Sequence, residues 1–210
     1  MEIIDLENPS FSCTNAHNFP RETRGSIGAL IDNKLMICGM SVTKSEPSCY
    51  MMQYEDDPEW RKYDAMIEER SGAASGSVVL NNQLVMVGGQ VGVSASGIEL
   101  VSPETGTRKL KTKLPIDDLI GACMVPWDTN SIMVIGGYHN GKSMGRTYII
   151  DTVEDNWSGY PSLKVPRYNH ACQELTVNGE SYIVVVGGKG VQSTEFLSKS
   201  NYEKGWKEGE

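Results

Sequence analysis

Residues 132–137, Ile-Met-Val-Ile-Gly-Gly, show most clearly a pattern that decides the fold of this 210-residue chain. Four apolar residues, rich in β-branched types, are followed at once by glycine. The same pattern recurs at residues 35–39, 84–89 and 183–188. A short apolar run that ends at glycine is typical of a strand buried on both faces, whereas an amphipathic helix needs a longer run with a period of 3.6 residues. The sequence therefore predicts four buried strands.

The spacing of the four runs indicates an internal repeat. Their first glycines stand 49, 48 and 51 residues apart. Each run follows a turn at the same offset, at Asp32-Asn33, Asn81-Asn82, Thr129-Asn130 and Asn178-Gly179. Asn, Asp and Gly tolerate the positive φ angles that tight hairpins require, so another strand is expected upstream of each turn. Two further strand patterns follow each run, and four strands per unit of about 48 residues is typical of a propeller blade.

At these residues the chain resembles the kelch-repeat family, in which a glycine pair is followed by a spaced Tyr and then a Trp. Tyr54 with Trp60 fits that pattern, and Tyr148 with Trp157 fits it loosely, whereas Arg108 replaces a Trp and Met40 replaces a second glycine. The resemblance implies an all-β, kelch-type β-propeller of four-stranded antiparallel blades. The expected units are a half blade at 1–20 and blades at 21–66, 67–115, 116–163 and 164–210. We expect an incomplete propeller from a longer chain; a small closed propeller remains the alternative.

Composition excludes several classes of function. The formal net charge is −8, so no surface for binding the phosphates of nucleic acid is expected. No apolar run approaches the length of a membrane-spanning helix. The first residues show no signal-peptide pattern, which slightly favours a cytoplasmic over a secreted protein and leaves the compartment open. The triplet Asn156-Trp157-Ser158 is a glycosylation sequon, a pattern that also arises by chance.

The five cysteines form no Cys-x-x-Cys pair, so a structural zinc site is not expected. Two interpretations stay open. The thiols are reduced and mostly buried, or Cys38 and Cys49 form a disulfide, which requires an oxidising compartment. Cys38 ends one predicted strand and Cys49 begins the next. We therefore expect their Cα atoms to lie within reach of a disulfide, roughly 4.4–6.8 Å apart.

Most of the residues that stand out are assigned structural roles. No phosphate-binding loop pattern surrounds the glycines, which are expected to allow sharp turns and close approach of backbones. They are Gly39, Gly88, Gly89, Gly136, Gly137, Gly187 and Gly188. Trp60, Trp157 and Trp206 are expected to be buried between blades. His17, His139 and His170 are too scattered for a catalytic or metal-binding set, so no catalytic residue, metal or cofactor is predicted.

One set of residues is a candidate for binding a partner. Arg24, Arg70 and Arg167 each precede the innermost predicted strand of a unit, and Tyr168 and His170 adjoin the last of them. The resemblance implies that such arginines face the central mouth and bind acidic peptides, for which the planar guanidinium is suited. Asp117-Asp118 interrupts the set, which indicates a mouth of mixed charge. The alternative is that these arginines cap loops or pair with carboxylates of the sheets.

The predicted function is therefore a non-catalytic protein-interaction module that holds a protein or peptide at the propeller mouth. The resemblance further implies a role as substrate adaptor of a ubiquitin ligase, if a BTB domain precedes the repeats. The alternative from another class is a kelch-fold enzyme, such as a copper-radical oxidase similar to galactose oxidase, although its ligand set cannot be assembled from these residues.

Overall fold

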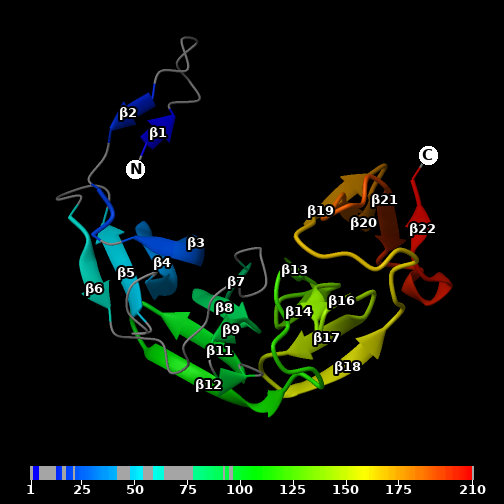
Figure 1. The fold of residues 1–210 in the computed structure, drawn as a ribbon, viewed down its shortest axis with the longest axis horizontal. Coiled ribbons are helices and arrows are strands. Elements are labelled where there is room, and N and C mark those ends of the chain that lie inside the picture. The colour runs from blue at the N-terminus through cyan, green and yellow to red at the C-terminus, as the bar shows by residue number, and fades with distance from the viewer. Residues whose placement is uncertain are drawn as a thin grey trace.

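The computed structural model describes residues 2–4, 13–15, 18–20, 22–41, 48–53, 59–63, 78–91, 93–94 and 97–209. Within these residues the protein is all-β and contains no α-helix; a single 3-10 turn, η1, spans Tyr202–Lys204. Four four-stranded antiparallel sheets follow one another along an open arc (Figure 1). No helix in the described part of the chain is long and apolar enough to cross a membrane.

Each sheet is formed by strands that are consecutive in the sequence, apart from short hairpins. The first sheet contains β3 (Thr23–Ile31), β4 (Lys34–Ser41), β5 (Ser48–Gln53) and β6 (Arg61–Tyr63). The second contains β7 (Val78–Leu80), β8 (Gln83–Val87), β11 (Gly97–Ser102) and β12 (Gly106–Lys113). The third contains β13 (Cys123–Pro126), β14 (Ser131–Ile135), β17 (Thr147–Asp151) and β18 (Asn156–Tyr160). The fourth contains β19 (Ala171–Val177), β20 (Glu180–Val186), β21 (Thr194–Ser198) and β22 (Lys207–Glu208).

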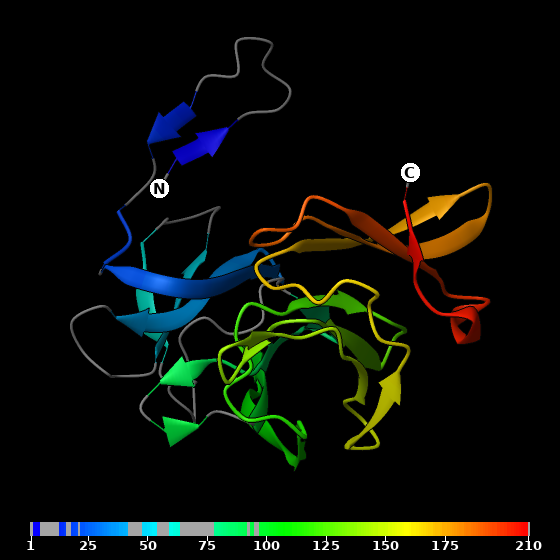
Figure 2. The same cartoon turned by 45° about the vertical axis from the view of Figure 1, so that its right-hand side comes forward.

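Three two-stranded hairpins complete the described strands. They are β1 (Glu2–Ile4) with β2 (Cys13–Asn15), β9 (Gln90–Val91) with β10 (Val93–Ser94), and β15 (Tyr138–His139) with β16 (Lys142–Ser143). In the four large sheets the first strand lies on the inner side of the arc and the fourth strand on its outer side (Figure 1). The fourth sheet lies next to the third in both views, with β19 against β13 (Figure 1 and Figure 2).

The predicted buried strands are the second strands of the sheets, and in β8 and β14 the side chains alternate between two neighbouring sheets. In β14, Ile132 and Val134 pack in the cluster shared with the second sheet, whereas Met133 and Ile135 pack in the cluster shared with the fourth. Alternate side chains of a strand point to opposite faces, so a strand between two sheets must be apolar at every position. This requirement explains the continuous apolar runs.

The fourth sheet departs from this arrangement because one of its faces is uncovered in the described structure. Val185 packs against the third sheet and is fully buried. Its neighbour Val186 points to the other face and is 49% exposed, and Leu175 and Val177 on β19 are exposed as well. The arc is therefore open, and the sheets do not close into a ring within the described residues.

Three of the four predicted hairpin turns have the backbone that tight hairpins favour. Asp32-Asn33, Asn81-Asn82 and Asn178-Gly179 all have positive φ angles, between 48° and 79°. Thr129-Asn130 does not. There β13 ends at Pro126, and the longer loop closes as the backbone N–H groups of Trp127 and Asp128 donate to the Ser131 carbonyl.

The expectation that three tryptophans are buried is wrong for Trp157. Trp206 is buried, and its Nε1–H donates to the Pro161 carbonyl at 2.8 Å. Trp60 is partly buried and contacts the ring of Phe19. Trp157 lies on β18, the outer edge strand of its sheet, where it packs edge-on against Tyr148 but leaves 38% of its surface exposed.

Candidate functional site

Four of the five cysteines form two disulfides. Cys38 and Cys49 are directly opposite each other on β4 and β5, with Cα atoms 4.0 Å apart and bonded sulfurs. Cys123 on β13 is bonded to Cys172 on β19, which joins the innermost strands of the third and fourth sheets. The interpretation of reduced thiols is therefore wrong for these four residues. Cys123 and Cys172 are 49 residues apart, one repeat length, which is the signal in the sequence that identifies this pair.

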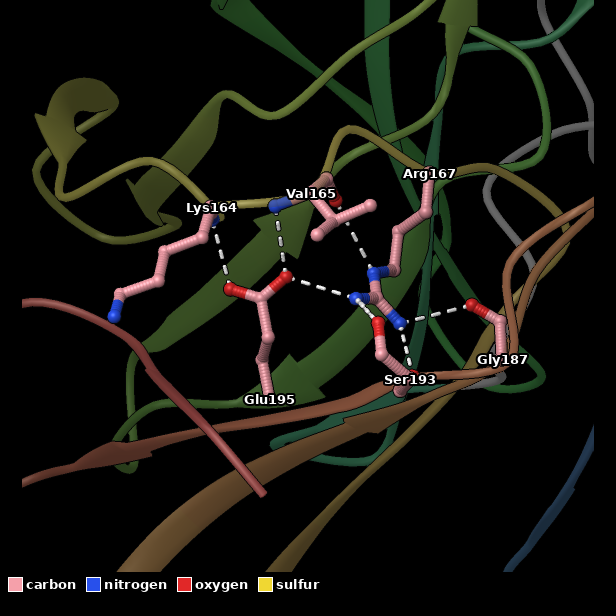
Figure 3. Close-up of polar contacts among 6 residues, drawn as sticks. All are labelled: Lys164, Val165, Arg167, Gly187, Ser193 and Glu195. Carbon is pink, nitrogen blue, oxygen red and sulfur yellow. Dashed lines mark hydrogen bonds and ion pairs between the residues drawn. The ribbon is translucent and has the colours of Figure 1, made fainter. Parts of the chain in front are cut away.

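Arg167 lies inside the protein, in the segment that leads into β19, and its side chain is fully buried (Figure 3). Nη1–H groups donate to the carbonyls of Gly187 and Ser193 at 3.0 and 2.7 Å. Nη2–H groups donate to Ser193 Oγ and Glu195 Oε1 at 3.0 and 2.8 Å. Nε–H donates to the Val165 carbonyl. These bonds use all the N–H donors of the guanidinium, so no donor is left for an external ligand.

Glu195 completes this cluster and is also fully buried. Besides Arg167, it accepts the backbone N–H groups of Lys164 and Val165 at 2.8 and 3.0 Å. The carboxylate thus ties the loop between the third and fourth sheets to β21 (Figure 3). Glu99 occupies the same repeat position. It is paired with Met86, as Glu195 is paired with Val185, and each of these partners stands two residues before a glycine pair. Glu99 is equally buried. The equivalent residues of the first and third sheets are Tyr50 and Tyr148, so a buried carboxylate stands at this position in the second and fourth sheets.

The expectation that Arg167 is accessible to a partner is accordingly wrong. His170, placed on the same predicted surface, is also buried, with 4% of its surface exposed. Burial, with a smaller contribution from the nearby Arg167 cation, lowers the pKa of His170 from 6.5 to about 4. Neither ring nitrogen has a hydrogen-bond partner among the described residues. At neutral pH His170 is therefore an uncharged group of the interior.

The remaining predicted binding residues have different positions. Arg24 lies in β3 opposite Met40, but its side chain falls outside the described structure, as does all of Arg70. The arrangement of the three arginines on one rim stays a prediction. Tyr168 is partly exposed and is the member of the set that the structure places at the surface.

Tyr168 belongs to a small surface cluster, which we name the rim cluster and define as Tyr138, Tyr168 and Lys189. The rings of Tyr138 and Tyr168 are tilted against each other with centroids 4.8 Å apart. The Lys189 ammonium lies 5.9 Å from the centroid of the Tyr168 ring, within the range of a cation–π contact. Tyr138 and Tyr168 come from loops of successive sheets, so the cluster spans the junction between the third and fourth sheets.

The glycine steps fix the backbone beneath the rim cluster. Gly136 and Gly137 have φ angles of 63° and 111°, which a residue with a side chain rarely adopts. The Gly137 N–H donates to the Arg167 carbonyl at 2.9 Å, so the glycine step of the third sheet is bonded to the chain that enters the fourth. Gly89 makes the equivalent bond to the Leu119 carbonyl. Tyr138 is held by two backbone bonds with Ile120, and Tyr168 accepts the Lys189 N–H.

The other glycines of this set also occupy strained or crowded backbone positions. Gly187 and Gly188 have φ angles of 68° and 121°. Gly88 has a φ of 68°, and a Cβ there would meet the Leu119 carbonyl oxygen. Gly39 lies within β4, where a Cβ would meet Ser26 on the adjacent strand. The absence of a side chain thus permits a close contact between sheets at Gly88 and a close contact within the first sheet at Gly39.

Charged side chains of both signs occur in the segments of the chain that adjoin the rim cluster in sequence. Lys142, Arg146 and Lys189 are exposed in the loops that follow the second strands. Asp117 is exposed and Asp118 partly exposed in the segment that leads into β13. This composition is suited to a ligand that carries both acidic and basic groups beside an apolar or aromatic one.

A separate feature, a shallow pocket, lies on the uncovered face of the fourth sheet. It is a pocket of 220 Å³ whose lining includes Glu180, Tyr182, Phe196 and Lys207. Glu180 accepts hydroxyl hydrogen bonds from Tyr182, Ser198 and Ser200, which lower its pKa to about 2. The carboxylate is therefore committed to these bonds at neutral pH. Among the described residues, no three His, Cys, Asp or Glu side chains are grouped as metal ligands.

Comparisons with known proteins do not assign the chain to a family. No protein-family model matches the chain, and no curated protein matches it.

Proposed function

We propose that the chain is a segment of a kelch-type β-propeller that binds a protein or peptide through the loops at the junction of the third and fourth sheets. The repeat spacing, the consecutive four-stranded sheets and their arrangement along an arc support the propeller (Figure 1). The observation that carries the binding proposal is the rim cluster, because it places two partly exposed tyrosines and a lysine on loops held by a rigid frame.

Partly exposed aromatic side chains are typical of binding surfaces. Tyrosine offers a large apolar area with little side-chain entropy to lose, and tyrosine and arginine are enriched among the residues that dominate binding energy. Loops on a rigid scaffold commonly carry such residues. The disulfide Cys123–Cys172 joins β13 to β19, and the buried pair Arg167–Glu195 joins the segment that enters the fourth sheet to β21, so both cross-links hold this frame together.

The test is selection of peptides from a random-sequence library on the immobilised, disulfide-bonded protein, followed by affinity measurement with one selected synthetic peptide. Tyr168→Ala and Lys189→Ala are expected to weaken binding at least tenfold, because side chains at the centre of an interface contribute about 1.4 kcal/mol or more. Lys113→Ala, which removes an exposed lysine from β12, is the matched control and should leave the affinity unchanged. Equal affinity for all four proteins would contradict the proposed surface.

A further inference from the structure

The triplet Asn156-Trp157-Ser158 stands at the start of β18 and has no role in the binding surface. It is the one Asn-x-Ser/Thr triplet of the chain in which the middle residue is not proline, since Asn8-Pro9-Ser10 is blocked by Pro9. A sequon alone says little. Whether it can be modified depends on the exposure of its Asn and on the compartment in which the chain folds.

The structure gives this triplet the exposure that modification requires. Residues 156–159 are all exposed, and they follow the turn that ends at Asp155. In the described structure β18 pairs with β17 along one edge and with no strand along the other. Because side chains two residues apart in a strand share a face, the Asn156 amide and the Ser158 hydroxyl lie on the same side of the sheet. Both groups of the sequon are thus presented together at a free edge.

The two disulfides give independent evidence about the compartment. Disulfides persist in secreted proteins and in the endoplasmic reticulum lumen, and they are rare in the cytosol, where thiols are kept reduced. Both bonds here are built into the fold, one within the first sheet and one between the third and fourth sheets. The sequence alone slightly favours the cytoplasm, because the first residues show no signal-peptide pattern. The disulfides favour the secretory compartment. That compartment is also where oligosaccharides are transferred to asparagine.

We propose that Asn156 is an N-glycosylation site. In the transfer, the Asn156 Nδ2 forms a bond to the anomeric carbon of an oligosaccharide carried on a lipid pyrophosphate. The bond between that carbon and the pyrophosphate oxygen breaks, the lipid pyrophosphate leaves with the electron pair, and the amide nitrogen loses one proton. The lipid-linked oligosaccharide is the co-reactant, and no oxidant or reductant takes part.

The position of Asn156 fits a structural purpose for the glycan. An unpaired strand edge is a template for pairing with another chain, and proteins protect such edges by covering them. A glycan on Asn156 covers this edge at the start of β18. β18 lies on the outer side of the arc, whereas β13 and β19 lie on its inner side (Figure 1). The glycan therefore projects outward and leaves the rim cluster accessible.

The experiment expresses the full chain behind a cleavable signal sequence in a eukaryotic secretory host. Wild-type protein is expected to lose one glycan on treatment with peptide-N-glycosidase, with Asn156 converted to Asp in the peptide mass spectrum. Asn156→Gln and Ser158→Ala should abolish the shift in electrophoretic mobility, and Ser158→Thr should retain it. A mobility shift that persists in Asn156→Gln would overturn the proposal.

A matched positive control uses another exposed site of the same protein. Lys142→Thr creates a sequon at Asn140, in the exposed turn between β15 and β16. If the Lys142→Thr variant gains one glycan while wild-type protein secreted by the same cells carries none, Asn156 is not an acceptor and the proposal fails. If wild-type protein carries one glycan and Lys142→Thr carries two, the assignment to Asn156 holds.

Discussion

Arg167 and Glu195 form an ion pair of 2.8 Å in which both side chains are fully buried. Nearly every remaining donor and acceptor of the pair is bonded to backbone of the surrounding loops. A buried charge without a partner is far more costly than a buried pair. The pair therefore acts as a joint between the loop that enters the fourth sheet and its third strand.

Removal of one partner should reveal this role. Arg167→Ala leaves the Glu195 carboxylate buried without its cation, and we expect the free energy of unfolding to fall by about 3–5 kcal/mol. Lys199→Ala is the control, because the Lys199–Glu174 pair is partly exposed and should contribute less than about 1 kcal/mol. Urea unfolding followed by tryptophan fluorescence measures both. Equal losses in the two variants would show that the buried pair is not a structural joint.

The two disulfides should stabilise the protein to different extents. Closing a longer loop removes more entropy from the unfolded chain, and the loop separations are 49 residues for Cys123–Cys172 and 11 for Cys38–Cys49. Replacing both cysteines of a pair with Ala should cost about 4 kcal/mol for the first pair and about 3 kcal/mol for the second. Urea unfolding of the two double variants gives the order, and peptide mapping without reduction verifies the connectivity. Detection of Cys38 bonded to Cys123 would contradict the structure.

The sequence predicted the features that repeat and missed those that depend on distant partners. Apolar runs, turns and glycines recur at one period, so the sheets and three hairpin turns follow from local chemistry. Arg167 looks accessible in sequence because Glu195 stands 28 residues later, on a different strand. Trp157 resembles the buried tryptophans in sequence, but it lies on β18, the outer edge strand of its sheet, and is therefore exposed. The sequence pointed to Tyr168 of the rim cluster, whereas Tyr138 and Lys189, each directly after a glycine pair, were missed because their contacts with Tyr168 are made between sheets.

The glycine steps offer a test of close backbone approach that is separate from backbone strain. Gly136 and Gly141 both have positive φ angles, 63° and 78°, so alanine should cost about 1–2 kcal/mol at either position. A Cβ at Gly136 would lie 2.6 Å from the Arg167 carbonyl oxygen, whereas at Gly141 it would meet nothing within 4 Å. Gly136→Ala should therefore cost a further 1–3 kcal/mol, roughly. Thermal unfolding compares the variants, and equal losses would contradict the close approach.

His170 should make the stability depend on pH. Its pKa is about 4 in the folded protein against 6.5 for an exposed histidine, so between these values the unfolded chain binds more protons than the folded one. Stability should therefore be highest above pH 6.5, fall as the pH decreases toward 4, and change no further through this group below 4. The full effect is about 3 kcal/mol, since one pKa unit corresponds to about 1.4 kcal/mol.

The measurement is urea unfolding at pH 7, 5.5 and 4 for wild-type protein and for His170→Met, which removes the titrating ring but keeps an apolar side chain of adaptable shape. Carboxylates such as Glu180, whose pKa is lowered to about 2, titrate in both proteins and cancel in the difference. The wild type should lose more stability than the variant between pH 7 and pH 4, because burial opposes the charged imidazolium only when the ring is present. If the two proteins lose the same stability over this range, His170 is hydrated or paired in solution, and the buried neutral state described here is wrong.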